Sequence, residues 1–280
     1  MQRRTWVFGL AATASGLLSG CVEGMFFHPD RLTYATPAAL GVTARDVYFA
    51  TDDGATLHGW WLPATGAARA TLVHAHGNAA NISNHLPLVA WLPAAGIDVL
   101  TFDYRGFGRS TGTPTLDGVV ADMRAAFAEA RRRATAHPLV LLGQSLGGAT
   151  AIRALAQDAA GGANDVKLLI CDSAFSSYRG IAREAASGSV LSVVAPFALP
   201  TLPAATSDPL NAITSLRAPL LLLHGELDQV IAIRHSERLH AAATSPKQFV
   251  RIKDGHHIDA LQRPDIRDRV LASIANSLGS

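Results

Sequence analysis

The sequence has little cysteine, no marked excess of charge and no long hydrophobic run. Cys21 and Cys171 are its only cysteines, so a disulfide framework is excluded and we expect no disulfide. The chain carries 24 lysines and arginines against 22 acidic residues, which argues against a basic patch and against a nucleic-acid partner. Histidines and cysteines do not cluster at the spacing of metal ligands, so we expect neither a metal site nor another cofactor.

Apolar residues are abundant instead. They make up 49% of the 280 residues, which is enough for a substantial hydrophobic core. This length can hold two small domains, but large α/β folds often form one domain of this size. We therefore expect a single globular domain over residues 41–280, preceded by short N-terminal segments.

The N-terminal segment has the organisation of an export signal. Arg3 and Arg4 precede an apolar run over residues 6–18 that is too short for a comfortable membrane span. The run is followed by Ser-Gly-Cys ending at Cys21. This ending resembles the bacterial lipobox, in which the cysteine is acylated and becomes the first residue of the mature protein. We expect a signal peptide over residues 1–20, and an uncleaved anchor or an ordinary secretory signal is the alternative.

Acylation of Cys21 would place the protein in the cell envelope, attached to a membrane. Several acyl chains on one cysteine anchor a protein stably, because each buried CH₂ contributes about 0.8 kcal/mol. Val22 stands where the rule for retention at the inner membrane usually requires aspartate. We therefore expect the outer membrane if the source is Gram-negative. Residues 21–40 are interpreted as a tether that leads to the folded domain.

From residue 42 onward, strand-like and helix-like segments alternate. Two β-rich runs on either side of Asp53-Gly54 predict an antiparallel hairpin. Strands are further predicted over residues 70–75, 97–102, 139–142, 166–171, 220–224 and 248–252, and helices over residues 81–95, 115–136, 146–156, 232–243 and 258–278. This alternation predicts a mostly parallel sheet with helices on both faces. A site is expected at the carboxyl ends of the strands.

An apolar, proline-containing stretch over residues 187–206 interrupts this alternation. It is interpreted as a small insertion between two core strands. Two hypotheses stay open for it: a short cap that lines an apolar acyl pocket, or a packed crossover.

Residues 139–150 predict a nucleophile elbow. A buried strand leads into Gly-Gln-Ser-Leu-Gly over residues 143–147, and the pattern G-x-S-x-G between a strand and a helix is typical of such a turn. The turn needs glycine where its two arms approach each other, and it holds Ser145 in a strained backbone conformation. The N–H groups of the helix that follows can stabilise an oxyanion.

A serine nucleophile needs a base, an acid that orients the base, and an oxyanion hole. The acid is expected after the penultimate strand, where Asp228 is the candidate and Glu226 is its competitor. The base is expected after the last strand, where His256 and His257 are adjacent. The chain order of Ser145, aspartate and histidine is the order found in α/β-hydrolases.

Four sequence blocks carry a resemblance to a known family. They are His76-Gly77-Asn78-Ala79-Ala80-Asn81-Ile82, Asp103-Tyr104-Arg105-Gly106-Phe107-Gly108-Arg109-Ser110, the elbow, and His224-Gly225-x-x-Asp228. From Val42 nearly to its end, the chain resembles the α/β-hydrolase superfamily. Within it, the chain is similar to the branch that includes exported bacterial members and eukaryotic protein-depalmitoylating enzymes. The resemblance implies the α/β-hydrolase fold.

The resemblance also implies roles for single residues. The family's His-Gly dipeptide precedes its oxyanion loop, which assigns one backbone N–H donor to Asn78 and the other to Leu146. Family members commonly carry Gly-His-Asn-Asp at the base. The match of Asp259 to the last aspartate of that run selects His257 over His256, although the chain departs from the run at its glycine and asparagine positions.

Together these residues predict a serine hydrolase. It would cleave an acyl ester of a small or lipid-like substrate through Ser145, His257 and Asp228, with an acyl-enzyme intermediate. Thioester or peptide hydrolysis is the enzymatic alternative, because the same three groups suit all of these bonds. A lipid-anchored binding or scaffold protein that keeps the fold without turnover is the non-enzymatic alternative.

Overall fold

The computed structural model describes residues 26–134, 137–158, 165–186 and 205–279. The predicted signal peptide, Cys21 and most of the insertion at residues 187–206 lie outside these ranges. Among the residues described, no helix combines the length and the apolar character needed to cross a membrane.

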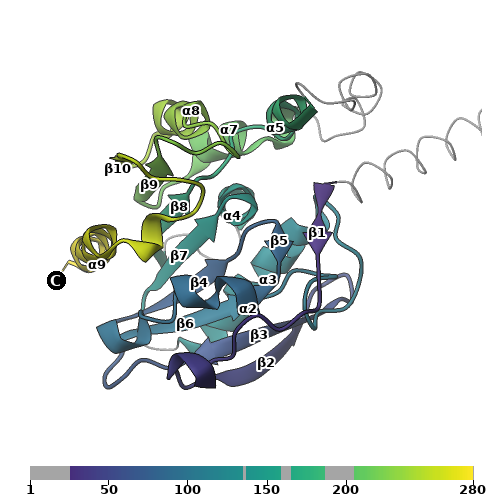
Figure 1. Ribbon diagram of the computed structural model, residues 1–280, viewed down its shortest axis with the longest axis vertical. Helices are drawn as coiled ribbons and strands as arrows, with labels where there is room; N and C mark the ends of the chain where they lie inside the picture. The colour runs from purple at the N-terminus through teal and green to yellow at the C-terminus, as the bar shows by residue number, and fades with distance from the viewer. Residues whose placement is uncertain (1–25, 135–136, 159–164, 187–204, 280) are drawn as a thin grey trace, which may run out of the picture.

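An eight-stranded sheet forms the centre of the molecule (Figure 1), in the order β10-β9-β8-β7-β4-β6-β3-β2. The strands are β2 Arg45–Ala50, β3 Thr56–Leu62, β4 Ala70–Ala75, β6 Ile97–Phe102, β7 Leu139–Gln144, β8 Val166–Asp172, β9 Leu220–Gly225 and β10 Lys247–Ile252. Neighbouring strands are parallel except at β3, which is antiparallel to both β2 and β6. The mostly parallel sheet and the antiparallel N-terminal hairpin are thereby confirmed.

Helices cover both faces of this sheet, as the alternation of segments predicted. They are α2 Ile82–His85, α3 Gly118–Arg133, α4 Leu146–Gln157, α5 Tyr178–Ala186, α7 Pro209–Ala212, α8 Arg234–Ala242 and α9 Pro264–Leu278. Successive side chains of a strand point to opposite faces, and β7 feeds a core on each side. Leu139 and Leu141 belong to the core that includes α3 and α4, whereas Val140 and Leu142 belong to the core that includes α9.

Two predicted helices were wrong in extent. Residues 81–95 form the short α2 followed by separate 3-10 turns. Pro87 and Pro93 explain the breaks, because proline lacks the N–H that a continuous helix requires. The last helix begins at Pro264 rather than at residue 258, after a loop and a 3-10 turn.

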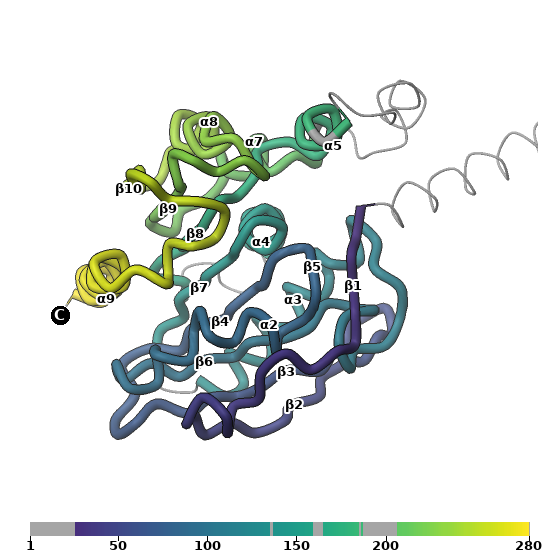
Figure 2. The backbone as a smooth tube through the Cα atoms, in the orientation of Figure 1, coloured from purple at the N-terminus to yellow at the C-terminus, as the bar shows by residue number. Residues whose placement is uncertain are grey.

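A second, two-stranded sheet lies next to the loop that follows β4. In it, β1 His28–Pro29 pairs in parallel with β5 Ala79–Ala80. Figure 2 shows the N-terminal chain crossing the molecule beside that loop. These N-terminal residues belong to the segment that the sequence indicated as a tether, and the structure joins them to the carboxyl end of the central sheet.

Candidate active site

Ser145 stands in the tight turn between β7 and α4. Its backbone has φ 53° and ψ −112°, a conformation that is strained for a residue with a Cβ atom. The flanking glycines permit the turn. A Cβ atom on Gly143 would lie 2.5 Å from the backbone of Gly147, and one on Gly147 would collide with the carbonyl oxygen of Ala75. The backbone therefore has the geometry expected of a nucleophile elbow.

The loops after β9 and β10 bring Asp228 and His257 together. Nδ1 of His257 lies 2.8 Å from Oδ2 of Asp228. The Asp228 side chain is fully buried, whereas 18% of the His257 side chain is exposed. The two competitors lie outside this pair: Glu226 and His256 are both exposed.

Hydrogen bonds keep the Asp228 carboxylate ionised. Its Oδ1 accepts from the backbone N–H groups of Val230 and Ile231, each at 2.9 Å. Its Oδ2 lies 3.3 Å from Nε2 of His224 in addition to its contact with His257. Burial acts to raise the pKa of Asp228, but the bonds from His224, His257 and Ile231 outweigh it and hold the pKa well below its usual range. A charged Asp228 can orient His257 and stabilise its protonated form.

From the sequence, His224 is expected to be structural or on the surface; the structure buries it beside Asp228. Its Nδ1 lies 2.7 Å from the Ser236 hydroxyl, and its Nε2 lies 2.8 Å from the Ile231 carbonyl oxygen. The imidazole thereby fixes the shape of the loop that carries Asp228. The signal was present in the block His-Gly-x-x-Asp, because the histidine precedes the aspartate by four residues.

Two glycines allow the acid loop and the base loop to approach each other. A Cβ atom on Gly225 would collide with the backbone of Gly255. The backbone N–H of Leu227 donates to the Gly255 carbonyl at 2.9 Å, and that of Glu226 donates to the Ile252 carbonyl at 3.0 Å. The side chains of Asp228 and His257 meet because these backbones lie so close.

The end of β8 connects the serine to the base loop. The backbone N–H of Ser145 donates to the Asp172 carbonyl oxygen at 2.8 Å. The backbone N–H of Ile258, next to His257, donates to the Ser173 hydroxyl at 3.4 Å. Ser145 is therefore attached to Asp172, and the base loop is attached to the next residue, Ser173.

A chain of buried hydrogen bonds runs beneath Ser145 across four strands. Nε2 of Gln144 donates to Oδ2 of Asp172 at 3.1 Å, and Oε1 of Gln144 lies 3.0 Å from Nε2 of His74. Nδ1 of His74 lies 2.9 Å from the Thr101 hydroxyl. Burial lowers the pKa of His74 to about 3, so this imidazole is neutral and can donate at one nitrogen and accept at the other. Burial raises the pKa of Asp172 to about 6, against the opposing bond from Gln144.

The loop after β4 and the start of α4 carry the two predicted oxyanion donors. The backbone N–H of Asn78 donates to no atom of the described residues. Leu146 opens α4, so its N–H has no acceptor within the helix. Gly147 allows the backbones of the two segments to approach, because a side chain there would collide with Ala75 and His76.

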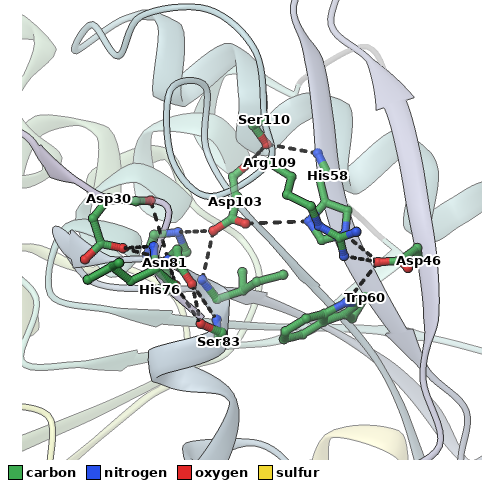
Figure 3. A network of polar contacts seen from close by, with 12 residues as sticks. Asp30, Asp46, His58, Trp60, His76, Asn81, Ser83, Asp103, Arg109 and Ser110 are labelled. Carbon is green, nitrogen blue, oxygen red and sulfur yellow. Dashed lines mark hydrogen bonds and ion pairs between the residues drawn. The ribbon is translucent and has the colours of Figure 1, made fainter. Parts of the chain in front are cut away.

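The buried carboxylate of Asp103 supports the same loop (Figure 3). Its Oδ1 accepts from the backbone N–H of Ile82 at 2.8 Å and lies 3.6 Å from Nε2 of His76. Its Oδ2 lies 3.6 Å from Nδ1 of His58. Burial holds the pKa of His76 well below its ordinary value. His76 is therefore neutral, and its Nδ1 lies 2.7 Å from the Gly77 carbonyl oxygen of the same loop.

Cys171 and Arg105 are two further reactive groups near the sheet. Cys171 is a buried free thiol in β8, and burial raises its pKa, so it is protonated at neutral pH. The guanidinium of Arg105 is held by Asp53 and Asp122. In the described part of the chain, no group of three or more His, Cys, Asp or Glu residues is placed to hold a metal ion.

Comparisons with known proteins agree with this architecture. A family model described as serine aminopeptidase, S33 matches residues 66–198. The uncharacterized protein YfhR of Escherichia coli O157:H7 is 41% identical over 241 residues, which is 84% of this chain and 80% of YfhR. The structure of the Pyrococcus furiosus esterase Pf2001 superposes with a TM-score of 0.72 at 21% identity, over 91% of this chain and 97% of the esterase. The chain belongs to the α/β-hydrolase superfamily.

This α/β-hydrolase also has a relative with a named lipid activity. Lysophosphatidylserine lipase ABHD12 of Macaca fascicularis is 28% identical over 205 residues, which cover 68% of this chain and 49% of ABHD12. The match leaves about half of that lipase outside the similarity, so its activity is not transferred to this hydrolase by the comparison itself.

Proposed function

We propose that this α/β-hydrolase is a serine esterase with Ser145 as nucleophile, His257 as base and Asp228 as orienting acid. One observation supports the proposal most: the 2.8 Å contact between His257 and Asp228 lies at the same edge of the sheet as a serine in a strained elbow. Strained backbone at a nucleophile is typical of a functional constraint.

The reaction would proceed through an acyl-enzyme. His257 takes the proton from the Ser145 hydroxyl as the serine oxygen bonds to the carbonyl carbon of the ester. The backbone N–H groups of Asn78 and Leu146 would stabilise the oxyanion, a contribution of about 3 kcal/mol for one donor. The alkoxide leaves with the proton from His257. Water then attacks the acyl-enzyme with the same histidine as base, which releases the acid and restores Ser145.

The first test is Ser145→Ala, assayed with p-nitrophenyl butyrate. We expect kcat to fall on the order of 10⁶-fold, because a catalytic serine acts as one unit with its base. A fluorophosphonate probe should label the wild-type chain at Ser145 and leave the variant unlabelled. Full activity of the variant would rule out Ser145 as the nucleophile. A wild-type chain that neither labels nor turns over esters would favour the binding or scaffold alternative.

Two findings point to different leaving groups for the same site. The lipase name of ABHD12 favours a lipid ester, whereas the aminopeptidase description of the family model favours an amide. We propose the ester, because the enzyme would act close to a membrane. A panel of p-nitrophenyl esters of increasing chain length, acyl thioesters and aminoacyl anilides separates the three bond types, and the ester assignment fails if either of the others gives the higher kcat/KM.

We further propose that Cys21 is acylated and that the enzyme is attached to a membrane of the cell envelope. Only four residues lie between Cys21 and Phe26, the first described residue, and the five residue steps that join the two reach at most about 18 Å. The lipid would therefore lie close to the folded domain. Cys21→Ser should move the protein from the membrane fraction to the soluble fraction; an unchanged distribution would contradict the anchor.

A further inference from the structure

The loop that carries Asn78 has its sheet partner in a segment far earlier in the chain. Residues 26–34, here named the N-terminal strap, run along the oxyanion loop, residues 78–83. The strap contributes β1, which pairs in parallel with β5 of the loop, with His28 opposite Ala79 and Pro29 opposite Ala80. The N–H of His28 donates to the Asn78 carbonyl and that of Asp30 to the Ala80 carbonyl, each at 3.3 Å.

Side chains strengthen this attachment at both ends of the oxyanion loop. At the beginning, Nδ2 of Asn78 donates to the Phe26 carbonyl oxygen. At the end, Nδ2 of Asn81 donates to Oδ1 of Asp30 and to the Leu32 carbonyl oxygen, each at 2.7 Å. Figure 3 shows Asp30 and Asn81 facing each other, with Asp103 on the other side of the loop.

The strap is itself fixed to the hydrophobic core. Phe27 is 3% exposed and packs edge-to-face on Phe107. The ring of Phe26 lies 6.3 Å from that of Phe175 and 6.0 Å from that of Tyr178, centroid to centroid. The strap therefore joins the loop after β8 to the loop after β4, which lie on either side of the elbow in the sheet order.

We propose that the N-terminal strap positions the oxyanion hole, with Asn81 and Asp30 as its positioning residues. The inference rests on the proposed function, because it concerns the backbone N–H of Asn78 as an oxyanion donor. Ala80 has a positive φ of 61°, so the loop holds a strained conformation that must be imposed by its partners. Without the strap, the oxyanion loop keeps the hydrogen bond from the Ile82 N–H to Asp103. It loses the contacts with the strap that fix its position relative to the sheet.

The test uses Asn81→Ala and Asp30→Ala, which remove the attachment from the loop side and from the strap side. We expect kcat to fall about tenfold or more, because a displacement of about 1 Å at the reacting groups can cost about 100-fold. KM should change less than about twofold, since an oxyanion donor acts on the transition state rather than on the bound substrate. The affinity for a trifluoromethyl ketone, which forms a tetrahedral oxyanion on the serine, should fall by the same factor as kcat.

Two further variants make the result specific. Thr36→Ala, whose hydroxyl accepts from the Ala39 backbone N–H at an exposed site, is the matched control and should keep wild-type kcat. The double variant of Asn81 and Asp30 should lose no more activity than Asn81→Ala, because Asn81→Ala already removes the bond to Asp30.

The outcomes separate this inference from the proposed function. Wild-type turnover together with Asn81→Ala and Asp30→Ala variants that match Thr36→Ala would overturn the strap and leave the esterase standing. A fall in kcat with unchanged affinity for the ketone would also overturn it, because general loosening would then explain the loss. If one variant does not fold, the other decides. Absence of turnover in the wild-type chain would remove the proposed function and the inference with it.

Discussion

The two sides of the candidate active site are held in place in different ways. On the base side, the supports lie near the groups they hold: His224 is four residues from Asp228, and the Asp259 carboxylate accepts from the N–H of His256, three residues away. On the oxyanion side, Asn81 is held by Asp30, 51 residues earlier in the chain. Several supports of the base side therefore come from nearby in the chain, although the bond from Ile258 to Ser173 spans 85 residues. The attachment of Asn81 to Asp30 depends on long-range packing.

The kind of interaction differs as well. The base side contains a buried carboxylate with hydrogen bonds from two imidazoles and two backbone N–H groups. The oxyanion loop is held mainly by backbone pairing and by amide donors, together with the Asp30 and Asp103 carboxylates. Removing the charge of Asp228 should therefore abolish the function of the base side. The oxyanion side should instead respond to the loss of side chains that form hydrogen bonds.

Among the variants that distinguish the two sides of the site, Asp228→Asn is expected to have the largest effect. The amide keeps the size of the side chain but removes the charge that stabilises protonated His257, so kcat should fall about 10⁴-fold. Steady-state kinetics with p-nitrophenyl butyrate measure this change, and near-UV circular dichroism checks that the fold is kept. The matched control is Glu226→Gln, which removes an exposed carboxylate of the same loop and should leave kcat unchanged. A large loss of kcat in Glu226→Gln with little loss in Asp228→Asn would show that Glu226, and not Asp228, is the orienting acid.

A smaller effect on stability is expected from Asp172→Asn, beneath the elbow. Burial raises the pKa of the Asp172 carboxyl from 3.8 to about 6, so the folded chain keeps this proton at pH values where the unfolded chain has lost it. This group's contribution to stability therefore decreases as the pH rises from about 4 to 6. The asparagine variant avoids the cost of ionisation and should be more stable at pH 8 by up to about 3 kcal/mol.

Urea unfolding of wild type and Asp172→Asn at pH 8, 6 and 4.5 measures this difference. The advantage of the variant should shrink as the pH falls toward 4. An advantage that is independent of pH would show that the variant acts through packing or hydrogen bonding rather than through the buried charge. Asp172 lies between the two sides of the site, and its bond to Gln144 continues through His74 to Thr101.

The sequence predicted what depends on local pattern. Short motifs and the alternation of elements predicted that Ser145, Asp228 and His257 each follow a strand. The choice of His257 over His256 depended on the resemblance to the family's Gly-His-Asn-Asp run. The contact between His257 and Asp228 agrees with that choice. The break of the helix over residues 81–95 was predictable from its prolines, which exclude a continuous helix.

The contacts of the N-terminal strap could not be predicted in the same way. Asp30 and Asn81 are ordinary polar residues in segments without periodicity, and their pairing depends on how two distant loops pack. The two-residue strands β1 and β5 are too short to leave an alternating pattern. The same holds for the chain of buried hydrogen bonds beneath Ser145. Its residues come from four strands that become neighbours only in the folded sheet.

The smallest effect is expected on the base side, at Ile258. Its φ of 51° is unfavourable for a β-branched residue, whereas asparagine tolerates this region. The family pattern has asparagine at this position. Ile258→Asn should therefore raise the free energy of unfolding by about 1 kcal/mol, partly offset by the loss of its half-buried apolar contacts, with kcat within about twofold of wild type. Ile258→Val keeps both the branching and the strain and should give no gain. If the asparagine variant loses as much stability as the valine variant, backbone strain does not limit this loop, and the apolar contacts of Ile258 are what hold the base in place.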